Sequence, residues 1–314
     1  MNWNQAMHFA ELASVHYQTP TLLTIGKFDG VHQAHQQLLR RLVERARQHN
    51  CHSAVLTFDP HPDEILRPER EIRYLTTINE RAALMQELGI DLLAVLPFTH
   101  DTSQLSPKAF LQLLLNHVPV RELWVGPDFK LGHRGMGTIP VLHDLGQELG
   151  FTVEPIPYWT LDGEIVSSTA IRSCLAAGDV QTANHYLGRA FSLQGTVVPG
   201  DQRGRKIGFP TANVQIASNH MLPADGVYVC KVQLLDDRRS FGAVTNIGVR
   251  PTFGVLGRAV EAHLFDFNED IYGRPLRISF LQHIRGEQKF AGIEQLVAQI
   301  GRDAQFAREW LAKP

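Results

Sequence analysis

The chain has 314 residues, which is more than one typical domain and enough for two. Hydrophobic residues make up 44% and charged residues 20% of the sequence, so the protein can bury a sizeable core. The formal net charge of -2 excludes a general electrostatic attraction to nucleic acid or anionic lipid. The sequence shows neither a secretory signal nor an apolar run near the roughly 20 residues that a membrane-spanning helix needs. We therefore expect neither a nucleic-acid partner nor membrane association.

Three cysteines, Cys51, Cys174 and Cys230, are scattered along the sequence, and none belongs to a CxxC pair. This spacing argues against a disulfide framework and against a thiolate zinc site. A reducing cytoplasm is the expected location.

The first half of the chain alternates apolar, strand-like runs with amphipathic, helix-like stretches. This rhythm predicts a parallel sheet flanked by helices, with functional loops at the carboxyl ends of the strands. In the helix predicted over 79–89, Asn79 is the expected N-cap and Gly89 the stop. The predicted strands cover 21–26, 54–58, 91–98, 122–126 and 151–157, and the predicted helices cover 35–49, 79–89, 106–117, 141–149, 167–179 and 181–189.

After residue 189 the pattern changes to strand-like runs that turns, rather than helices, separate. Such a series predicts a small antiparallel barrel or sandwich. The final 21 residues before Ala312 have helical periodicity and are expected to pack on it. We place the domain boundary near 183–192, with domains over 1–186 and 187–314. The expected strands cover 192–198, 226–235, 241–248, 260–267 and 276–282.

The first motif with chemical potential is GKFDGVHQAH, residues 26–35, between a predicted strand and a predicted helix. His32 and His35 are three residues apart, so they share one face of the helix start. A helix N-terminus offers unpaired N–H groups and partial positive charge to a phosphate, and two imidazoles there could stabilise a transferring phosphoryl group. The alternative is a capping turn with two incidental surface histidines.

Two further motifs are weaker in isolation. VGPDFKLGHRGMGT, residues 125–138, is rich in glycine and carries Lys130 and Arg134, but it does not match the GxGxxG order and could be a surface loop. SSTAIR, residues 167–172, places Arg172 one turn into a predicted helix, although capping alone accounts for its hydroxyl residues.

Taken together, the three motifs resemble the nucleotidyltransferases of the HxGH superfamily. FDGxH, FDPHP and VGxDF are similar to the adenylyltransferase domain of the bacterial bifunctional riboflavin kinase/FAD synthetase family, over about 22–189. The resemblance implies a Rossmann-like α/β domain in which His32 and His35 are catalytic. Asn79 is a further candidate binder. The implied ATP- and phosphate-binding residues are Gly26, Phe28, Asp29, Gly30, Asp128, Ser168, Thr169 and Arg172.

The second half contains GDQRGRKIGFPTAN, residues 200–213, and no Walker-A pattern. Thr211 and Asn213 are two residues apart, so on an extended segment they face the same side. Two oxygen ligands on one side suit magnesium, which bridges phosphates and keeps several waters. The alternative is a turn with an internally bonded Thr–Asn pair. Glu261 lies within an apolar strand-like run, as either a rim residue or a positioned base.

GFPTAN, NIGVRPTF, VEAHLFDF, IYG and IRGEQKF occur in the order that is typical of the riboflavin kinase domain, over about 187–312. The resemblance implies a six-stranded barrel in which Gly208 and Pro210 bind ATP and Thr211 and Asn213 hold Mg²⁺–ATP. It further implies that Glu261 takes the proton of the riboflavin 5′-hydroxyl, and that Arg285 lies near the flavin.

The expected activity is therefore phosphorylation of riboflavin to FMN with ATP, followed by adenylylation of FMN to FAD with release of pyrophosphate. The expected partners are riboflavin, FMN and ATP. Two alternatives stay open: a riboflavin kinase with weak or lost adenylyltransferase activity, and a non-catalytic flavin-binding regulator. The first rests on Ala34, where the family usually has glycine in HxGH, and to a lesser degree on Ala170 in SSTAIR.

Overall fold

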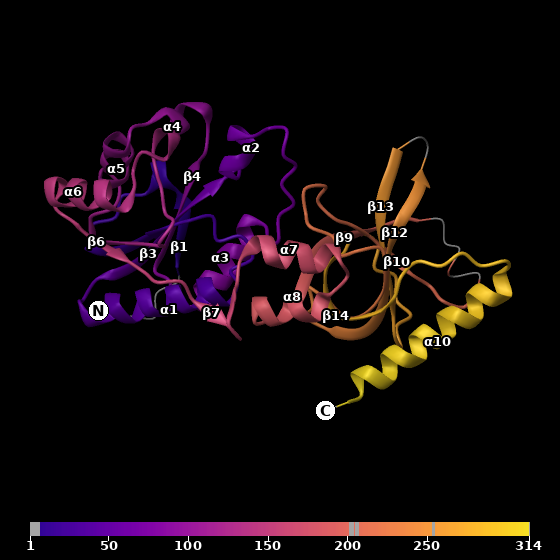
Figure 1. Cartoon of the computed structure of the whole chain (residues 1–314). Coiled ribbons are helices and arrows are strands. Elements are labelled where there is room, and N and C mark those ends of the chain that lie inside the picture. The colour runs from indigo at the N-terminus through magenta and orange to yellow at the C-terminus, as the bar shows by residue number, and fades with distance from the viewer. Residues whose placement is uncertain (1–6, 201–203, 205–206, 253–254, 314) are drawn as a thin grey trace. The chain divides into compact units, whose positions relative to one another are not determined.

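The computed structural model describes residues 7–200, 204, 207–252 and 255–313 (Figure 1). These residues form two compact units, which divide between Ser167 and Ser168.

The first unit contains a six-stranded parallel sheet in the order β1-β4-β3-β2-β5-β6. The predicted α/β fold of the first half is therefore confirmed. Its strands are β1 (His8–Glu11), β2 (Thr21–Ile25), β3 (His52–Asp59), β4 (Leu92–Pro97), β5 (Val120–Val125) and β6 (Thr152–Pro155), and a small hairpin joins β7 (Thr160–Leu161) to β8 (Glu164–Ile165). Its helices are η1 (Leu12–Ser14), α1 (Gln33–Gln48), α2 (Pro62–Leu66), α3 (Ile78–Glu87), α4 (His100–Gln104), α5 (Pro107–Leu115), η2 (His133–Gly135) and α6 (Ile139–Leu149).

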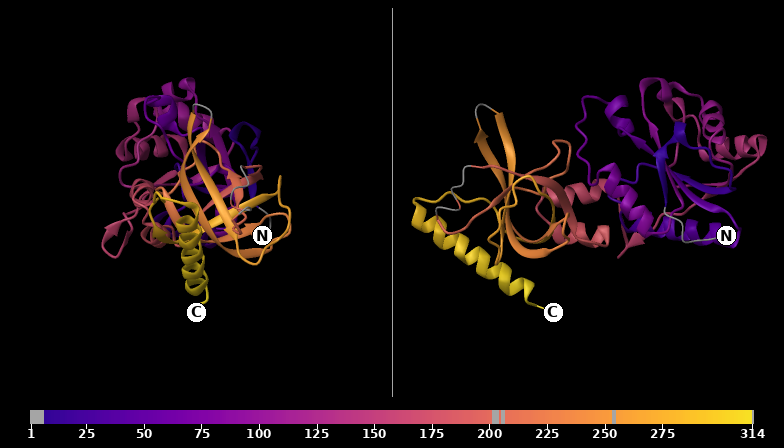
Figure 2. Two further views of the ribbon diagram at one scale, coloured as in Figure 1. Left: turned by 90° about the vertical axis from the view of Figure 1, so that its right-hand side faces the viewer. Right: turned by 180° about the vertical axis from the view of Figure 1, so that it is seen from behind.

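Helices cover both faces of this sheet, as the two views of the unit in Figure 2 show. Successive strand side chains point to opposite faces, so Leu22 and Leu23 of β2 enter two different cores. Leu22 packs with residues of α1 and α3, and Leu23 packs with residues of α5 and α6. This arrangement explains why the strands read as continuous apolar runs rather than as alternating patterns.

The structure corrects the start of the helix that was expected over 79–89. Thr77, and not Asn79, is the N-cap of α3: its Oγ1 accepts from the Glu80 N–H at 3.2 Å, while Glu80 Oε2 accepts from the Thr77 N–H at 2.7 Å. The T-x-x-E spacing of this capping box was present in the sequence. Gly89, at φ 83°, follows the helix as expected.

The second unit contains a closed antiparallel barrel in the order β10-β13-β12-β11-β14-β9, which confirms the predicted barrel. Its strands are β9 (Phe191–Val198), β10 (Ala212–Gln215), β11 (Gly226–Leu234), β12 (Ser240–Thr252), β13 (Val255–Leu264) and β14 (Pro275–Arg285), and its helices are α7 (Ser168–Ala176), α8 (Val180–Leu187) and α10 (Ile293–Leu311). The tail helix packs on the barrel as predicted, because Ala304 and Ala307 lie against Val229 and Phe265.

Helices α7 and α8 belong to the same compact unit as the barrel, whereas we expected them in the first domain. The side chain of Asn184 explains the difference. Its Nδ2 donates to the Phe280 carbonyl at 2.8 Å, and its Oδ1 accepts from the Phe191 N–H at 2.6 Å. These bonds tie α8 to β14 and β9, so the structural division lies nearer residue 168 than the predicted functional boundary at 186/187.

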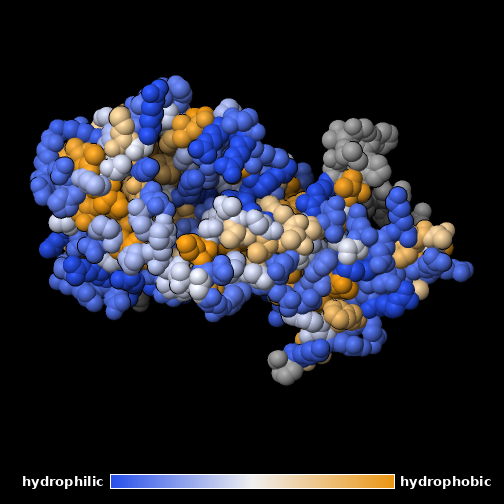
Figure 3. All heavy atoms as spheres, viewed as in Figure 1, coloured by the Kyte–Doolittle hydropathy of each residue, from blue (hydrophilic) through white to orange (hydrophobic). Residues whose placement is uncertain are grey.

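The surface shown in Figure 3 is mostly hydrophilic, and apolar residues gather there only in small separate groups. All three cysteines are free thiols, and Cys51 and Cys230 are buried.

Candidate active sites

The first candidate site lies at the carboxyl edge of the parallel sheet. Strand order reverses at β2, which has β3 on one side and β5 on the other. Ligands of open α/β sheets bind at such a switch point. GKFDG follows β2 and GPDF follows β5, so the fold brings these two predicted motifs to the same edge.

The GKFDG loop is held in a strained conformation. Phe28 and Val31 adopt positive φ values of 50° and 38°, which are costly for residues with large or branched side chains. Asp29 is 2% exposed, and its Oδ1 accepts from the N–H groups of Leu75 and Thr76, each at 3.0 Å. Asp29 therefore holds the loop in place, and a direct contact between Asp29 and ATP stays a prediction.

The two predicted histidines form a stacked pair at the start of α1. Their ring centroids are 3.6 Å apart and their planes differ by 17°. His32 is the N-cap, and its Nδ1 accepts from the His35 backbone N–H at 3.4 Å. The Phe28 ring lies 4.9 Å from the His35 ring. The i, i+3 spacing thus places both imidazoles at the positive end of the helix.

His35 is set up to accept a further partner. Burial, with the neighbouring His32 as a second cause, holds its pKa well below the usual 6.5, so the ring is neutral at neutral pH. Its Nδ1 is buried and has no hydrogen-bond partner within the described part of the chain. Buried polar groups are normally bonded, and exceptions concentrate at functional sites.

Sequence reasoning missed Arg81, which supports the same loop from α3. Arg81 is 2% exposed, and its NH1 donates to the Lys27 carbonyl at 2.9 Å and to Thr57 Oγ1 at 3.4 Å. Thr57 Oγ1 also donates to the Lys27 carbonyl, at 3.1 Å. A buried arginine on a short helix carries no local sequence signal, because its partners, the Lys27 carbonyl and the Thr57 hydroxyl, are distant in the chain.

The glycine-rich segment after β5 is ordered rather than a loose loop. A Cβ on Gly132, whose φ is 74°, would lie 2.7 Å from the Pro107 backbone nitrogen, so only glycine fits this close approach. Leu131 and Gly137 form a two-residue antiparallel bridge. Asp128 is exposed and accepts a hydrogen bond from the Tyr158 hydroxyl.

All of the SST-x-IR motif except Ser167 lies in the second compact unit. Ser168 and Thr169 begin α7, and Arg172 is one turn into the helix, as predicted. Ser173 Oγ donates to the Thr169 carbonyl at 3.1 Å. The roles of Ser168, Thr169 and Arg172 toward a nucleotide stay predictions.

The second candidate site is a row of polar side chains across three barrel strands. Glu261 of β13 is directly opposite Asn213 of β10 on one side and Asn246 of β12 on the other. Directly opposed residues point to the same face, with Cβ atoms about 4.5–5.5 Å apart. Their neighbours Ala262 and Val260 are buried in the barrel, so the three polar side chains lie on its outer face. The carboxylate of Glu261 therefore lies between two amides, and its role as a base stays a prediction.

The GFPTAN segment approaches this row closely. His263 Nδ1 donates to the Pro210 carbonyl at 2.8 Å, which ties the segment to β13. A Cβ on Gly200 would lie 2.1 Å from Asn213 Nδ2, so the glycine lets the backbone pass over the amide. Gly208 has a φ of 86°, which favours glycine. Residues 201–203, 205 and 206, which belong to the longer motif over 200–213, lie outside the described residues.

A pocket of about 410 Å³ opens beside Thr211. One wall is the β10 segment and the inner face of β13, and the other is the connection between β13 and β14. Its lining residues are Val197, Pro210, Thr211, Ala212, Ala262, Leu264, Phe267, Asn268, Glu269, Asp270, Ile271 and Tyr272. Thr211 belongs both to the pocket lining and to the GFPTAN segment, whereas Asn213, Glu261 and Asn246 do not line the pocket.

Arg285, the predicted flavin contact, is engaged with α10. Its Nε and NH2 donate to Asp303 Oδ2 at 3.0 and 2.8 Å, and the Asp303 side chain is 4% exposed. Gln299 Nε2 donates to the other Asp303 oxygen at 2.8 Å. This buried, forked ion pair fastens the tail helix to β14, and a flavin contact of Arg285 stays a prediction.

The described residues contain no group of three or more histidine, cysteine, aspartate or glutamate side chains that could enclose a metal ion. Thr211 and Asn213 offer neutral oxygen donors, and Glu261 lies next to Asn213 in the row. This donor set fits a hard cation that phosphates and waters mainly hold, which is the usual state of Mg²⁺.

The sheet holds a histidine pair at its switch point, and the barrel holds a carboxylate between two amides. Together these sites define a two-domain enzyme of nucleotide-dependent group transfer. Family models confirm both halves: FAD synthetase matches residues 14–170 and riboflavin kinase matches residues 187–311. The chain belongs to the family of bifunctional riboflavin kinase/FMN adenylyltransferases.

Relatives of that description span nearly the whole chain. The protein from Escherichia coli K12 is 38% identical over 300 residues, which cover 95% of each chain. The protein from Pseudomonas fluorescens is 41% identical over 293 residues, or 93% of each chain. A crystal structure described as a macrolide-efflux protein from Streptococcus pneumoniae is 29% identical, with a TM-score of 0.87 over 96% of this chain and 97% of the other. Among the described residues, none of the helices has the length and apolar character to cross a membrane.

Proposed function

We propose that this chain phosphorylates riboflavin to FMN with ATP and then adenylylates FMN to FAD, releasing pyrophosphate. The observation that carries the proposal is the presence in one chain of both candidate sites: the Asn213–Glu261–Asn246 row and the stacked His32–His35 pair. Relatives that bear both activities in their description match this chain along nearly its full length.

In the barrel, Glu261 accepts the proton of the ribityl 5′-hydroxyl. The hydroxyl oxygen then bonds to the γ-phosphorus of ATP, and the bond from that phosphorus to the β–γ bridging oxygen breaks, which leaves FMN and ADP. Thr211 and Asn213 would hold Mg²⁺, which supplies charge neutralisation on the phosphates when it is bound. Gly208 and Pro210 contribute backbone to the ATP site, and the pocket beside Thr211 receives the nucleotide.

In the α/β domain, a phosphate oxygen of FMN bonds to the α-phosphorus of a second ATP, and the bond to the β-phosphate oxygen breaks to release pyrophosphate. The FMN phosphate is already ionised near neutral pH, so no general base is required. His32 and His35 stabilise the charge that develops on the phosphoryl oxygens. The neutral state of His35 suits this role, because the negative charge of bound phosphates raises an imidazole pKa.

The other predicted ATP contacts fall into two groups. Gly26, Phe28 and Gly30 shape the loop beside the histidine pair, and Asp29 holds that loop. Asp128, Ser168, Thr169 and Arg172 remain proposed ligands of the nucleotide. The unpaired thiols support a cytoplasmic location.

The test is product analysis by chromatography after the purified chain is mixed with riboflavin, ATP and MgCl₂. We expect FMN to appear first and FAD to follow at its expense. FMN without FAD would leave only the kinase half of the proposal standing, and unchanged riboflavin would refute both halves.

A further inference from the structure

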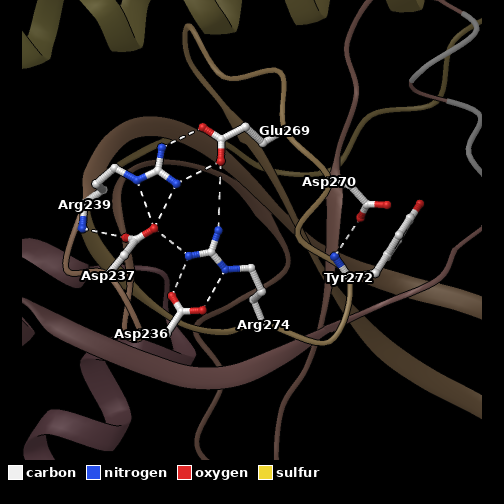
Figure 4. Close-up of polar contacts among 7 residues, drawn as sticks. All are labelled: Asp236, Asp237, Arg239, Glu269, Asp270, Tyr272 and Arg274. Atoms are coloured by element: carbon white, nitrogen blue, oxygen red, sulfur yellow. Dashed lines mark hydrogen bonds and ion pairs between the residues drawn. The ribbon is translucent and has the colours of Figure 1, made fainter.

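Five charged residues beside the barrel pocket form one continuous ionic network (Figure 4). Arg239 makes a forked pair with Glu269, with NH1 and NH2 donating to Oε1 and Oε2 at 2.6 and 2.8 Å. Arg274 makes a second forked pair with Asp236, at 2.7 and 2.6 Å. Asp237 accepts from both guanidinium groups and so joins the two pairs. We call these five residues the Arg239–Arg274 network.

The network connects two segments that are distant in the sequence. Asp236, Asp237 and Arg239 lie in the turn between β11 and β12, whereas Glu269 and Arg274 lie in the connection between β13 and β14. Each connection is a loop, and loops have more conformational freedom than the strands that they join. The ion pairs therefore restrict the β13–β14 connection by fastening it to a tight strand turn.

The fastened connection is one wall of the pocket beside Thr211. Residues 267–272 all line the pocket, and Glu269 belongs both to this wall and to the network. Asp270 Oδ1 accepts from the Tyr272 N–H at 3.0 Å, so the wall has a turn of its own next to the network. Arg239, Asp236 and Asp237 do not line the pocket, and can act on it only through the wall.

The geometry distinguishes this network from an ordinary surface ion pair. Its side chains are 23–49% exposed, and a single ion pair at such exposure contributes little to the free energy of unfolding. Two forked pairs that share a third carboxylate fix both the distance and the orientation of the segments. Hydrogen bonds from the arginines lower the pKa of Asp236, Asp237 and Glu269, so all three are ionised at neutral pH.

We propose that the Arg239–Arg274 network is a positioning device for ATP in riboflavin phosphorylation: it holds the wall formed by residues 267–272 in the conformation that binds the nucleotide. Arg239 and Arg274 are positioning residues, since they act through Glu269 and the wall. This inference rests on the proposed function of the pocket as the ATP site of the barrel.

The test uses the full chain and measures KM for ATP in two assays, FMN formation from riboflavin and FAD formation from supplied FMN. Arg239→Met keeps the apolar stem and removes the fork. We expect it to raise KM for ATP in FMN formation about three- to tenfold, with kcat nearly unchanged. This is the change expected if the fraction of molecules whose wall is in the nucleotide-binding conformation falls to about a third to a tenth. KM for ATP in FAD formation should not change. Arg239→Lys, which keeps the charge without the fork, should give an intermediate value.

The matched control is Asp225→Asn, which breaks the Arg258–Asp225 pair in the same unit, 34% exposed on each side, at a residue that does not line the pocket. It should leave both KM values unchanged. Tyr272→Ala tests the pocket itself. A raised KM in Tyr272→Ala with none in Arg239→Met would overturn the positioning role and keep the pocket. No change in either variant would overturn the assignment of the pocket to ATP, and the inference with it. Equal loss of kcat in both assays for Arg239→Met would reveal a folding defect and would also overturn the inference.

Discussion

Replacement of Asp29 by alanine should damage the first unit and leave the barrel reaction intact. Asp29 is 2% exposed, and its carboxylate accepts from the backbone N–H groups of Leu75 and Thr76. A buried donor left without an acceptor costs about 1–3 kcal/mol. With two such donors, we expect Asp29→Ala to lower the free energy of unfolding of this unit by about 2–6 kcal/mol. That is a large part of the free energy of unfolding of a whole domain, which is about 5–15 kcal/mol.

The assay is urea unfolding followed by circular dichroism, together with FAD formation from supplied FMN and FMN formation from riboflavin. FAD formation should be lost because the GKFDG loop is no longer held, and FMN formation should persist. The control is Asp63→Asn, which removes an exposed pair with Lys27 and should change the unfolding free energy by less than about 1 kcal/mol. An Asp29→Ala protein as stable as the control, with normal FAD formation, would refute this reasoning.

Four further expectations follow from the two sites. Glu261→Gln should reduce FMN formation by about 10²–10⁴-fold, the usual range for loss of a general base, while adenylylation of supplied FMN survives; near-normal kinase activity would exclude Glu261 as the base. Ala34→Gly, at the second residue of α1, should lower KM for ATP in FAD formation and cost up to about 1 kcal/mol of stability, and an unchanged KM would show that the site accommodates the methyl group. Because the pKa of His35 is held below 6.5 in the fold, the unfolded chain binds more protons than the folded chain below that pH. The free energy of unfolding should therefore fall there by up to about 1.4 kcal/mol per pH unit. Urea unfolding at several pH values measures this slope, and His35→Asn should remove the part that His35 contributes. A fragment over 168–314 should fold, make FMN and resist urea better than a fragment over 187–314, because the shorter fragment lacks the Asn184 hydrogen bonds. Equal resistance of the two fragments to urea would contradict the structural division near residue 168.

The elements that carry strong periodic patterns could be predicted from the sequence. The parallel strands β2 to β5 and the long helices α1, α5 and α6 are signalled by buried apolar runs and amphipathic repeats. The shared position of His32 and His35 at the helix start follows from their spacing. The common face of Asn213 and Glu261 depends on the pairing of β10 with β13, which could not be predicted.

Other features depend on contacts between distant segments, which one sequence does not reveal. Strand β1 has mostly exposed residues and is formed only through its parallel pairing with β4. Arg81 reaches the Lys27 carbonyl across 54 residues of sequence. Helices α7 and α8 continue the rhythm of the first half, yet Asn184 bonds α8 to the barrel, and the Leu175 carbonyl of α7 accepts from the Ala224 N–H at 2.8 Å. Arg285 lies in a motif that suggested flavin binding, and its ion pair with Asp303 is visible only in the fold.

The most direct test of two separate transfers in one chain is the fate of labelled phosphorus. The purified chain is supplied with riboflavin, Mg²⁺ and ATP labelled at either the γ- or the α-phosphorus, and the flavin products are separated by chromatography. We predict that γ-label enters FMN and is retained in FAD, whereas α-label enters FAD alone and never FMN. Absence of α-label from every flavin product would contradict the proposed adenylyl transfer, and absence of γ-label from FMN would contradict the proposed phosphorylation by the barrel.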